Sequence, residues 1–138
     1  MAERERYSVH FRVSGPDFDV DALVAAARPT AAHEVWRRGE LVGDEGHIAR
    51  TSGLQIELVD ASEEADVSGA IETFLDMEAP LLTALVRVTS DETHAVVSCA
   101  LWVLGDEAVS LTLPPALLTR LAAAGLSFET TGYPIAES

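Results

Sequence analysis

The stretch from His94 to Val103 constrains the fold most, because its side chains are apolar on both faces of the strand that its composition favours. It contains no Asp, Glu, Lys or Arg. A strand of this kind is typically buried on both sides, in the interior of a sheet. We therefore expect residues 94–103 to lie centrally in a sheet that helices cover.

The first 29 residues predict a strand followed by a helix. In residues 7–13 apolar and polar side chains alternate, which is typical of a strand with one solvated face. Ser14-Gly15-Pro16 ends this pattern, and Asp19 is placed to cap a helix that stops before Pro29. The apolar face of that helix consists of Val20, Leu23, Val24 and Ala27.

The middle of the chain predicts two strands and two helices. We expect strands over residues 33–41 and 54–58, with a turn at Gly39, Gly43 and Gly46 and Asp44-Glu45 inside it. Asp60 and Glu63 have the spacing of a capping box for the first helix, and Pro80 is placed to start the second. Apolar side chains of the first helix recur at i, i+3, i+4, i+7 and i+8, at Val67, Ala70, Ile71, Phe74 and Leu75.

The last third predicts a hairpin, a helix and a strand. Gly105-Asp106 marks a turn after the central strand, and residues 109–113 are expected to complete the hairpin. Pro114-Pro115 opens a helix that Gly125 closes, and residues 126–130 form the last strand. The order β-α-β-β-α-α-β-β-α-β indicates an α+β fold, with one mixed sheet packed by three to four helices in a single domain over residues 1–138.

Charge is distributed unevenly along the chain, whose net charge is −14. Residues 1–50 hold seven Arg and nine acids, a net of −2, whereas residues 51–138 hold two Arg and fourteen acids, a net of −12. Between Arg50 and Arg87 there are eight acids and no basic residue. Such a field repels nucleic acid and anionic lipid and attracts basic partners.

Composition also excludes several kinds of chemistry. The chain has no lysine, so it has neither a Schiff-base lysine nor the lysine of a phosphate-binding loop. Cys99 is the only cysteine, which excludes an internal disulfide, and its apolar surroundings indicate a buried, inert thiol. We find no pattern for catalytic residues, a metal or a cofactor, and no segment long enough to span a membrane. A non-enzymatic protein of the bacterial cytoplasm is expected.

Trp36-Arg37-Arg38-Gly39-Glu40 is the candidate ligand site. A tryptophan beside two guanidinium groups can stack on a planar ligand and bind a carboxylate or phosphate. The alternative is that Trp36 packs in the core while Arg37 and Arg38 pair with the abundant acids.

The acidic helix is the candidate partner-binding surface. Its acids fall mainly on the side away from the apolar face, without basic residues at i+4 to relieve their repulsion. They are Glu63, Glu64, Asp66, Glu72 and Asp76. The alternative is an ordinary solvated helix face.

Several short motifs resemble the bacterial family known as domain of unknown function 4279. They are Val13-Ser14-Gly15, Asp17-Phe18-Asp19-Val20 with Pro29, Val35-Trp36-Arg37-Arg38-Gly39-Glu40, and Leu113-Pro114-Pro115-Ala116-Leu117-Leu118 with Gly125 and Tyr133. Thr130-Thr131-Gly132 departs from the family in lacking an acid before the tyrosine. The resemblance implies a small α+β protein without an assigned activity, so it transfers no catalytic residue.

Three functional hypotheses follow. The first is a binding protein whose acidic face meets a basic protein, for example as an immunity- or antitoxin-type inhibitor. The second is binding or catalysis of a small anionic ligand near Trp36, Arg37, Arg38 and Glu40. The third is a homo-oligomeric scaffold.

Overall fold

A five-stranded mixed sheet organises the chain in the computed structural model, which describes residues 6–43 and 46–135. Its strand order is β2-β5-β1-β6-β7, and only the β6–β7 pair is parallel. These strands are β1 (Tyr7–Gly15), β2 (His33–Trp36), β5 (Ser52–Ala61), β6 (His94–Leu104) and β7 (Ser127–Ile135). A separate hairpin pairs β3 (Leu41–Val42) with β4 (His47–Ile48).

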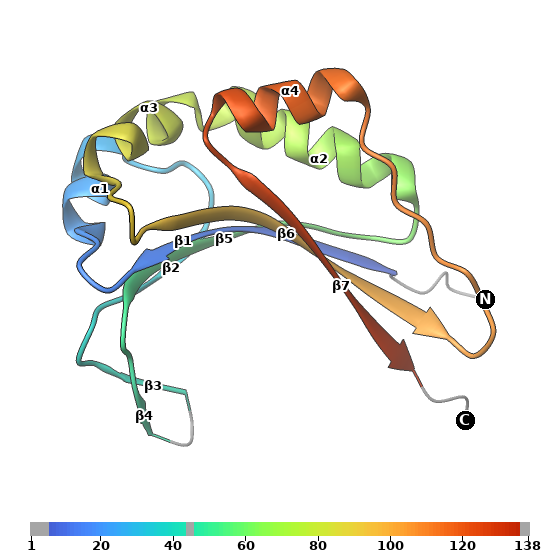
Figure 1. Cartoon of the computed structure of the whole chain (residues 1–138), viewed down its shortest axis with the longest axis horizontal. Helices are drawn as coiled ribbons and strands as arrows, with labels where there is room; N and C mark the ends of the chain where they lie inside the picture. Colours follow the sequence, from blue (N-terminus) through green and yellow to red (C-terminus); the bar gives the residue numbers. More distant parts are fainter. Residues whose placement is uncertain (1–5, 44–45, 136–138) are drawn as a thin grey trace.

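All four helices lie on one side of the sheet, and the β3–β4 hairpin extends on the other (Figure 1). The helices are α1 (Val20–Ala27), α2 (Glu64–Met77), α3 (Ala79–Val88) and α4 (Pro115–Ala123). Mixed strand directions and helices gathered on one face are typical of an α+β fold. The predicted fold class is confirmed.

The alternating pattern of β1 separates the two faces of the sheet. Val9, Phe11 and Val13 are fully buried beneath the helices, and the ring of Phe11 lies 5.0 Å from that of Phe74 on α2. Ser8, His10 and Arg12 alternate with them and therefore face the opposite side. β1 is the middle strand, so the core forms around it.

The central position predicted for residues 94–103 is confirmed, since β6 lies between β1 and β7. Val97 and Cys99 point into the core and are fully buried. Burial raises the pKa of the Cys99 thiol to about 11. This thiol is therefore uncharged and shielded at neutral pH.

The predicted cap of α1 is confirmed, whereas the predicted capping box of α2 is wrong. The side chain of Asp19 accepts a hydrogen bond of 3.0 Å from the backbone N–H of Ala22. Asp60 belongs instead to β5, where it pairs with Ser8, and Glu63 occupies the N-cap of α2 without a side-chain hydrogen bond. β5 continues to Ala61 because pairing with β1 satisfies its backbone as far as that residue.

The predicted hairpin strand over residues 109–113 does not form. β6 already has β1 and β7 as neighbours, so neither of its edges is available to a returning strand. Residues 105–114 instead cross from the end of β6 to α4, as the parallel β7 requires. The hydroxyl of Tyr7 holds this segment by donating a hydrogen bond of 2.7 Å to the carbonyl oxygen of Ser110.

Two other strand predictions had wrong ends. The strand expected over residues 33–41 stops at Trp36, and the chain turns through Gly39, whose φ of 91° favours glycine. The predicted turn lies in the β3–β4 hairpin, but Asp44 and Glu45 lie outside the described residues. The last strand extends to Ile135, because its parallel pairing with β6 continues past Gly132.

Candidate ligand-binding site

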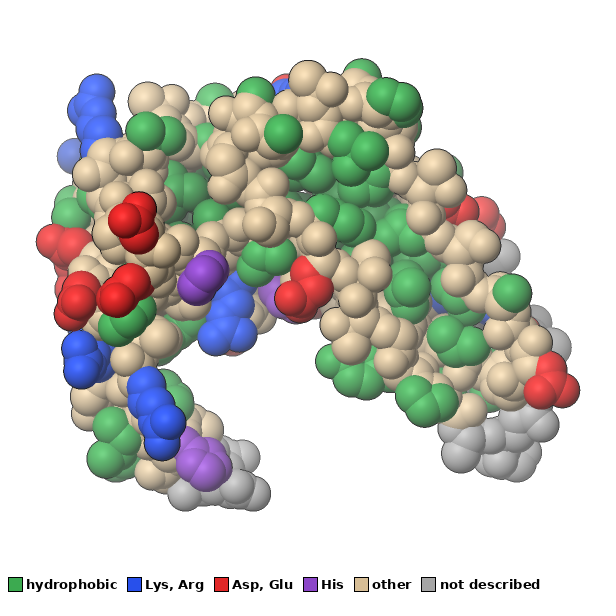
Figure 2. Space-filling model, viewed as in Figure 1, with side chains coloured by type: hydrophobic (Ala, Val, Ile, Leu, Met, Phe, Trp, Pro, Cys, Tyr) green, Lys and Arg blue, Asp and Glu red, His purple; other side chains and the backbone are tan. Residues whose placement is uncertain are grey.

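The face of the sheet opposite the helices carries most of the polar strand side chains; we call it the open face. It includes Ser8, His10 and Arg12 of β1, Gln55 and Glu57 of β5, Ser98 of β6 and Glu129 of β7. The molecule is hollowed beneath the sheet, between the β3–β4 hairpin and the end of β7, and Arg and His side chains lie at the edge of this hollow (Figure 2).

One cavity of the open face lies where the β3–β4 hairpin meets the sheet. We call it the arginine hollow; its volume is about 670 Å³. β1, β2 and β5 supply its floor, and the hairpin and the residues after it supply one wall. Its lining includes Arg12, Glu34, Trp36, Val42, Arg50 and Gln55.

The indole of Trp36 lies across β5 because residue 53 is glycine. A Cβ at Gly53 would lie 2.2 Å from Cζ2 of Trp36 and 2.6 Å from the carbonyl oxygen of Val13. Nε1 of Trp36 donates a hydrogen bond of 3.2 Å to Oγ1 of Thr51, and the guanidinium carbon of Arg12 lies 5.0 Å from the centre of the ring. Trp36 is thus half-buried on the open face, with Arg12 in cation–π contact.

Among the described residues, Arg12 and Arg50 are two arginines without acidic partners that line the same cavity. Within residues 6–43 and 46–135, neither forms an ion pair with a carboxylate. By contrast, acids pair with Arg6, Arg37, Arg38 and Arg120. Two arginines without carboxylate partners among the described residues therefore line one cavity, which suits it to an anionic group.

A second cavity of about 690 Å³ adjoins the first and shares Glu34 and Gln55 with it. We call it the carboxylate hollow, because Glu34, Glu57 and Asp60 line it together with His10 and His33. Desolvation, and then the charge of Arg12, lower the pKa of His10, while Glu129 acts in the opposite direction. His10 is therefore largely neutral at pH 7, and the carboxylates of Glu34, Glu57 and Asp60 give this cavity negative charge.

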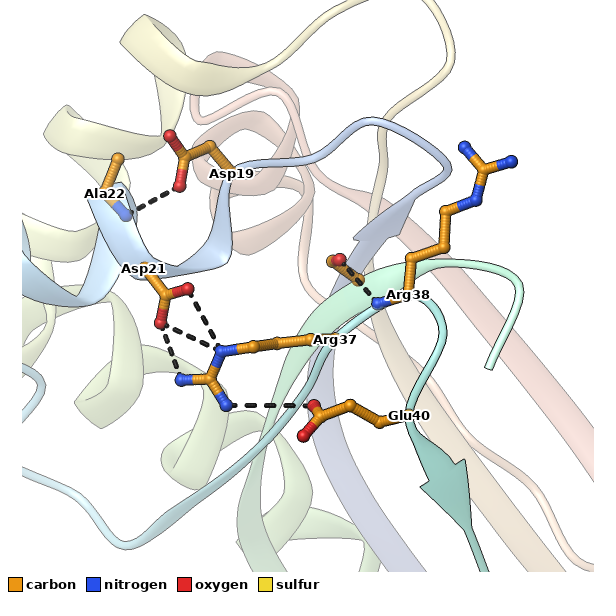
Figure 3. A network of polar contacts seen from close by, with 7 residues as sticks. Asp19, Asp21, Ala22, Arg37, Arg38 and Glu40 are labelled. Carbon is orange, nitrogen blue, oxygen red and sulfur yellow. Dashed lines mark hydrogen bonds and ion pairs between the residues drawn. The ribbon is translucent and has the colours of Figure 1, made fainter. Parts of the chain in front are cut away.

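The structure separates Trp36 from the other predicted ligand-site residues. Arg37 contacts Asp21 of α1 at 2.6 Å and Glu40 at 3.7 Å, and Arg38 contacts Asp17 at 3.4 Å. Figure 3 shows Arg37 between Asp21 and Glu40, with the guanidinium group of Arg38 directed away from them. The hydrogen bonds that Arg37 donates to Asp21 lower the pKa of the Asp21 carboxyl group. Arg37 thus links the end of β2 to α1, Arg38 links it to the segment before α1, and Glu40 pairs with Arg37. None of the three lines the arginine hollow.

The acids predicted to bind a partner also have different surroundings. A carboxylate oxygen of Glu64 accepts a hydrogen bond from the backbone N–H of Thr112, and Asp76 pairs with Arg120 at 2.6 Å. Glu63, Asp66 and Glu72 are exposed, and no ion pair involves them among the residues that the structure describes. Two of the five acids therefore contribute to holding their own fold together.

Sequence reasoning missed Arg12 and Arg50 as site residues. The sequence pattern could have indicated Arg12, since this residue occupies an outward position of the first predicted strand. No sequence pattern could have indicated Arg50, because only the path of the β3–β4 hairpin brings it beside Trp36. Neighbouring positions in sequence suggested Arg37 and Arg38 instead, although the chain turns away from the sheet after Trp36.

Throughout residues 6–43 and 46–135, no group of three or more His, Cys, Asp or Glu side chains is arranged to hold a metal ion. Among those same residues, no helix has the length and apolar character needed to cross a membrane.

Comparison with known proteins supplies a family without a stated activity. No curated protein matches the chain. The family model described as Domain of unknown function (DUF4279) matches residues 5–134, nearly the whole chain. The chain therefore belongs to the DUF4279 family.

Proposed function

We propose that this protein binds a small ligand with an anionic group and a flat apolar part in the arginine hollow. One observation carries the proposal: Arg12 and Arg50 lack carboxylate partners among the described residues, although the net charge is −14. In so acidic a chain, arginines without such partners leave guanidinium donors for a carboxylate or phosphate from outside.

The apolar part of the ligand would contact Trp36 and the hairpin. The indole is half-buried and held by Thr51, so little side-chain freedom is lost when a planar group packs against it. Val42 supplies apolar surface on the hairpin side. The arrangement supports binding rather than catalysis, since these groups contribute charge and stacking surface.

Tryptophan fluorescence tests this proposal. The chain has two tryptophans, so Trp102→Phe leaves Trp36 as the only emitter. Benzoate and phenyl phosphate are expected to change its emission on binding, whereas neutral benzamide binds more weakly. Arg12→Gln or Arg50→Gln is expected to weaken benzoate binding by about ten-fold, as for loss of one charge-assisted hydrogen bond.

Arg37→Gln is the matched control, because it removes an arginine from the same region that does not line the hollow. It is expected to leave the affinity for benzoate within about two-fold of the wild type. Equal affinities for benzoate and benzamide would refute the proposal. An equal loss of binding in the Arg37 variant would also do so.

A second candidate function is recognition of a basic protein by the acidic surface of α2. Glu63, Asp66 and Glu72 are exposed and lack ion-pair partners among the described residues, which favours this interaction. An immunity- or antitoxin-like inhibitor is one form of it. Capture from lysate of the native host identifies partners, and the affinity of each purified partner is then measured at rising salt.

Neutralising Glu63, Asp66 and Glu72 together, as Gln, Asn and Gln, is expected to weaken that affinity and its salt dependence. A partner that binds equally well at low and high salt would contradict this second candidate function.

We also propose a bacterial cytoplasmic location, to be tested by cell fractionation. Homo-oligomer formation is tested by light scattering.

A further inference from the structure

The two hollows of the open face adjoin each other and carry opposite charges at their far ends. Glu34 and Gln55 line both cavities, so the hollows meet at these two residues. Arg12 and Arg50 lie at one end and Asp60 lies at the other, with Glu57, opposite His10 of β1, between them. A ligand that covers both cavities would meet cationic groups at one end and anionic groups at the other.

The pairing of β1 with β5 sets the distance between these ends. Arg12 pairs with Gln55, and Ser8 pairs with Asp60. Arg12 lies four positions after Ser8 on β1, which corresponds to about 13 Å along the strand at about 3.3 Å per residue. The amine and carboxylate of one free amino acid are too close together to contact both ends. An extended chain of four residues spans about 13–14 Å and is long enough.

The surface between the two ends suits a peptide. Gln55 offers an amide group beside Arg12, its partner on β1, and can hydrogen-bond there to a peptide group of the ligand. Trp36 lies beside Arg12 and offers a flat apolar surface to a side chain near the anionic end. Because His10 is largely neutral at pH 7, it offsets little of the negative charge of the carboxylate hollow.

We infer that the open face binds an extended peptide of about four residues, with its C-terminal carboxylate at Arg12 and Arg50 and its N-terminal amine near Asp60. The last residue of the peptide would be aromatic and would pack on Trp36. This inference rests on the proposed function, since it assigns a ligand class to the same arginine hollow.

Calorimetry with the probe peptide Ala-Ala-Ala-Phe tests the inference. Three forms are compared: the free peptide, its N-acetylated form, and its C-terminal amide. Acetylation is expected to weaken binding to the wild-type protein by about five-fold, the upper range for an exposed ion pair. Amidation is expected to weaken it by about ten-fold, because the carboxylate loses charge-assisted hydrogen bonds.

A double-mutant comparison locates the amine end. In Asp60→Asn, acetylation is expected to change the affinity by less than about two-fold, because the carboxylate that distinguishes the two forms is gone. Asp66→Asn is the matched control, since Asp66 is an exposed acid on α2, and there the five-fold effect is expected to remain. Circular dichroism establishes that both variants are folded.

The outcomes separate this inference from the proposed function. If amidation weakens binding but acetylation does not, anion binding stands and the peptide assignment is overturned. If acetylation weakens binding to Asp60→Asn as much as to the wild type, the amine does not lie at the carboxylate hollow, which also overturns it. If neither benzoate nor any form of the peptide binds, both proposals fail.

Discussion

The two faces of β1 differ in both burial and polarity. Val9, Phe11 and Val13 point toward the helices and are fully buried, whereas Ser8, His10 and Arg12 point to the open face. Both sets belong to the same nine-residue strand and share the same backbone ladders with β5 and β6. The difference shows that one strand can contribute core packing on one face and ligand-binding groups on the other.

This separation has a physical reason. Burial of apolar surface contributes about 25 cal/mol per Å², so the covered face provides most of the stability. The open face contributes less, which leaves its residues able to hold charged groups that would destabilise a core. Substitutions on the two faces should therefore change different measured quantities.

Phe11→Ala is expected to have the largest effect on the free energy of unfolding. The substitution leaves a cavity beside Phe74, and losses of about 3–5 kcal/mol are typical of buried phenylalanine. Arg12→Ala, one residue away, removes an exposed cation–π contact of about 0.5–1 kcal/mol but weakens ligand binding. Urea denaturation measures the free energy of unfolding of each variant. Equal losses of stability in Phe11→Ala and Arg12→Ala would contradict the division between the two faces.

Cysteine labelling compares the faces through the neighbouring residues Ser98 and Cys99. Cys99 is fully buried and its pKa is raised to about 11, so both access and thiolate formation oppose alkylation. Iodoacetamide is expected to modify native Cys99 at least about a hundred-fold more slowly than a cysteine at position 98, because labelling requires local opening. The comparison uses Ser98→Cys in a Cys99→Ala background, followed by mass spectrometry.

Gly53→Ala tests how the open face accommodates Trp36. The new methyl group would lie 2.6 Å from the backbone oxygen of Val13 as well as 2.2 Å from the indole, so the strand itself must shift. We expect a loss of about 1–3 kcal/mol in thermal or urea unfolding, together with a changed Trp36 emission. Gly69→Ala is the control: no atom lies within 4 Å of its Cβ position on α2, and a gain of about 0.5–1 kcal/mol is expected.

The contribution of His10 to the pH dependence of stability is expected to be the smallest effect. Its side chain is only half-buried, so solvent screens its charge. Its pKa in the folded protein is lower than the ordinary value of 6.5. The unfolded state therefore binds more protons, and stability falls as the pH drops below about 6.5. His10→Gln should reduce this loss between about pH 7 and pH 5, as measured by urea unfolding at each pH.

Arg12→Gln tests how far the charge of Arg12 contributes to the lowered pKa of His10. Since the charge of Arg12 contributes to the lowered pKa of His10, its removal should move that pKa upward. An NMR titration of the His10 ring measures the change. An unchanged pKa would show that burial alone accounts for the shift.

Sequence reasoning predicted most elements of the fold and fewer of the residues at the candidate site. The patterns at residues 7–13, 20–27 and 94–103 reflect local backbone geometry and burial, which repeat within each element. The strand expected over residues 109–113 failed because its composition does not reveal that β7 already occupies that edge of β6. The capping box at Asp60 failed for a similar reason, since pairing with β1 prevailed over a local helix signal.

By itself, the sequence determined most of the helices and strands, that β6 is interior, that the fold is α+β, and that the chain is strongly acidic. These properties depend on periodicity and composition, which are local or summed quantities. Only the tertiary structure decided which arginines have acid partners and which line a hollow. Arg37 pairs with Asp21 of α1 and Arg38 with Asp17 before it, while Arg12 and Arg50, 38 positions apart in the sequence, line the same cavity as Trp36. Strand pairing and the path of the hairpin bring them together, and no local pattern encodes that contact.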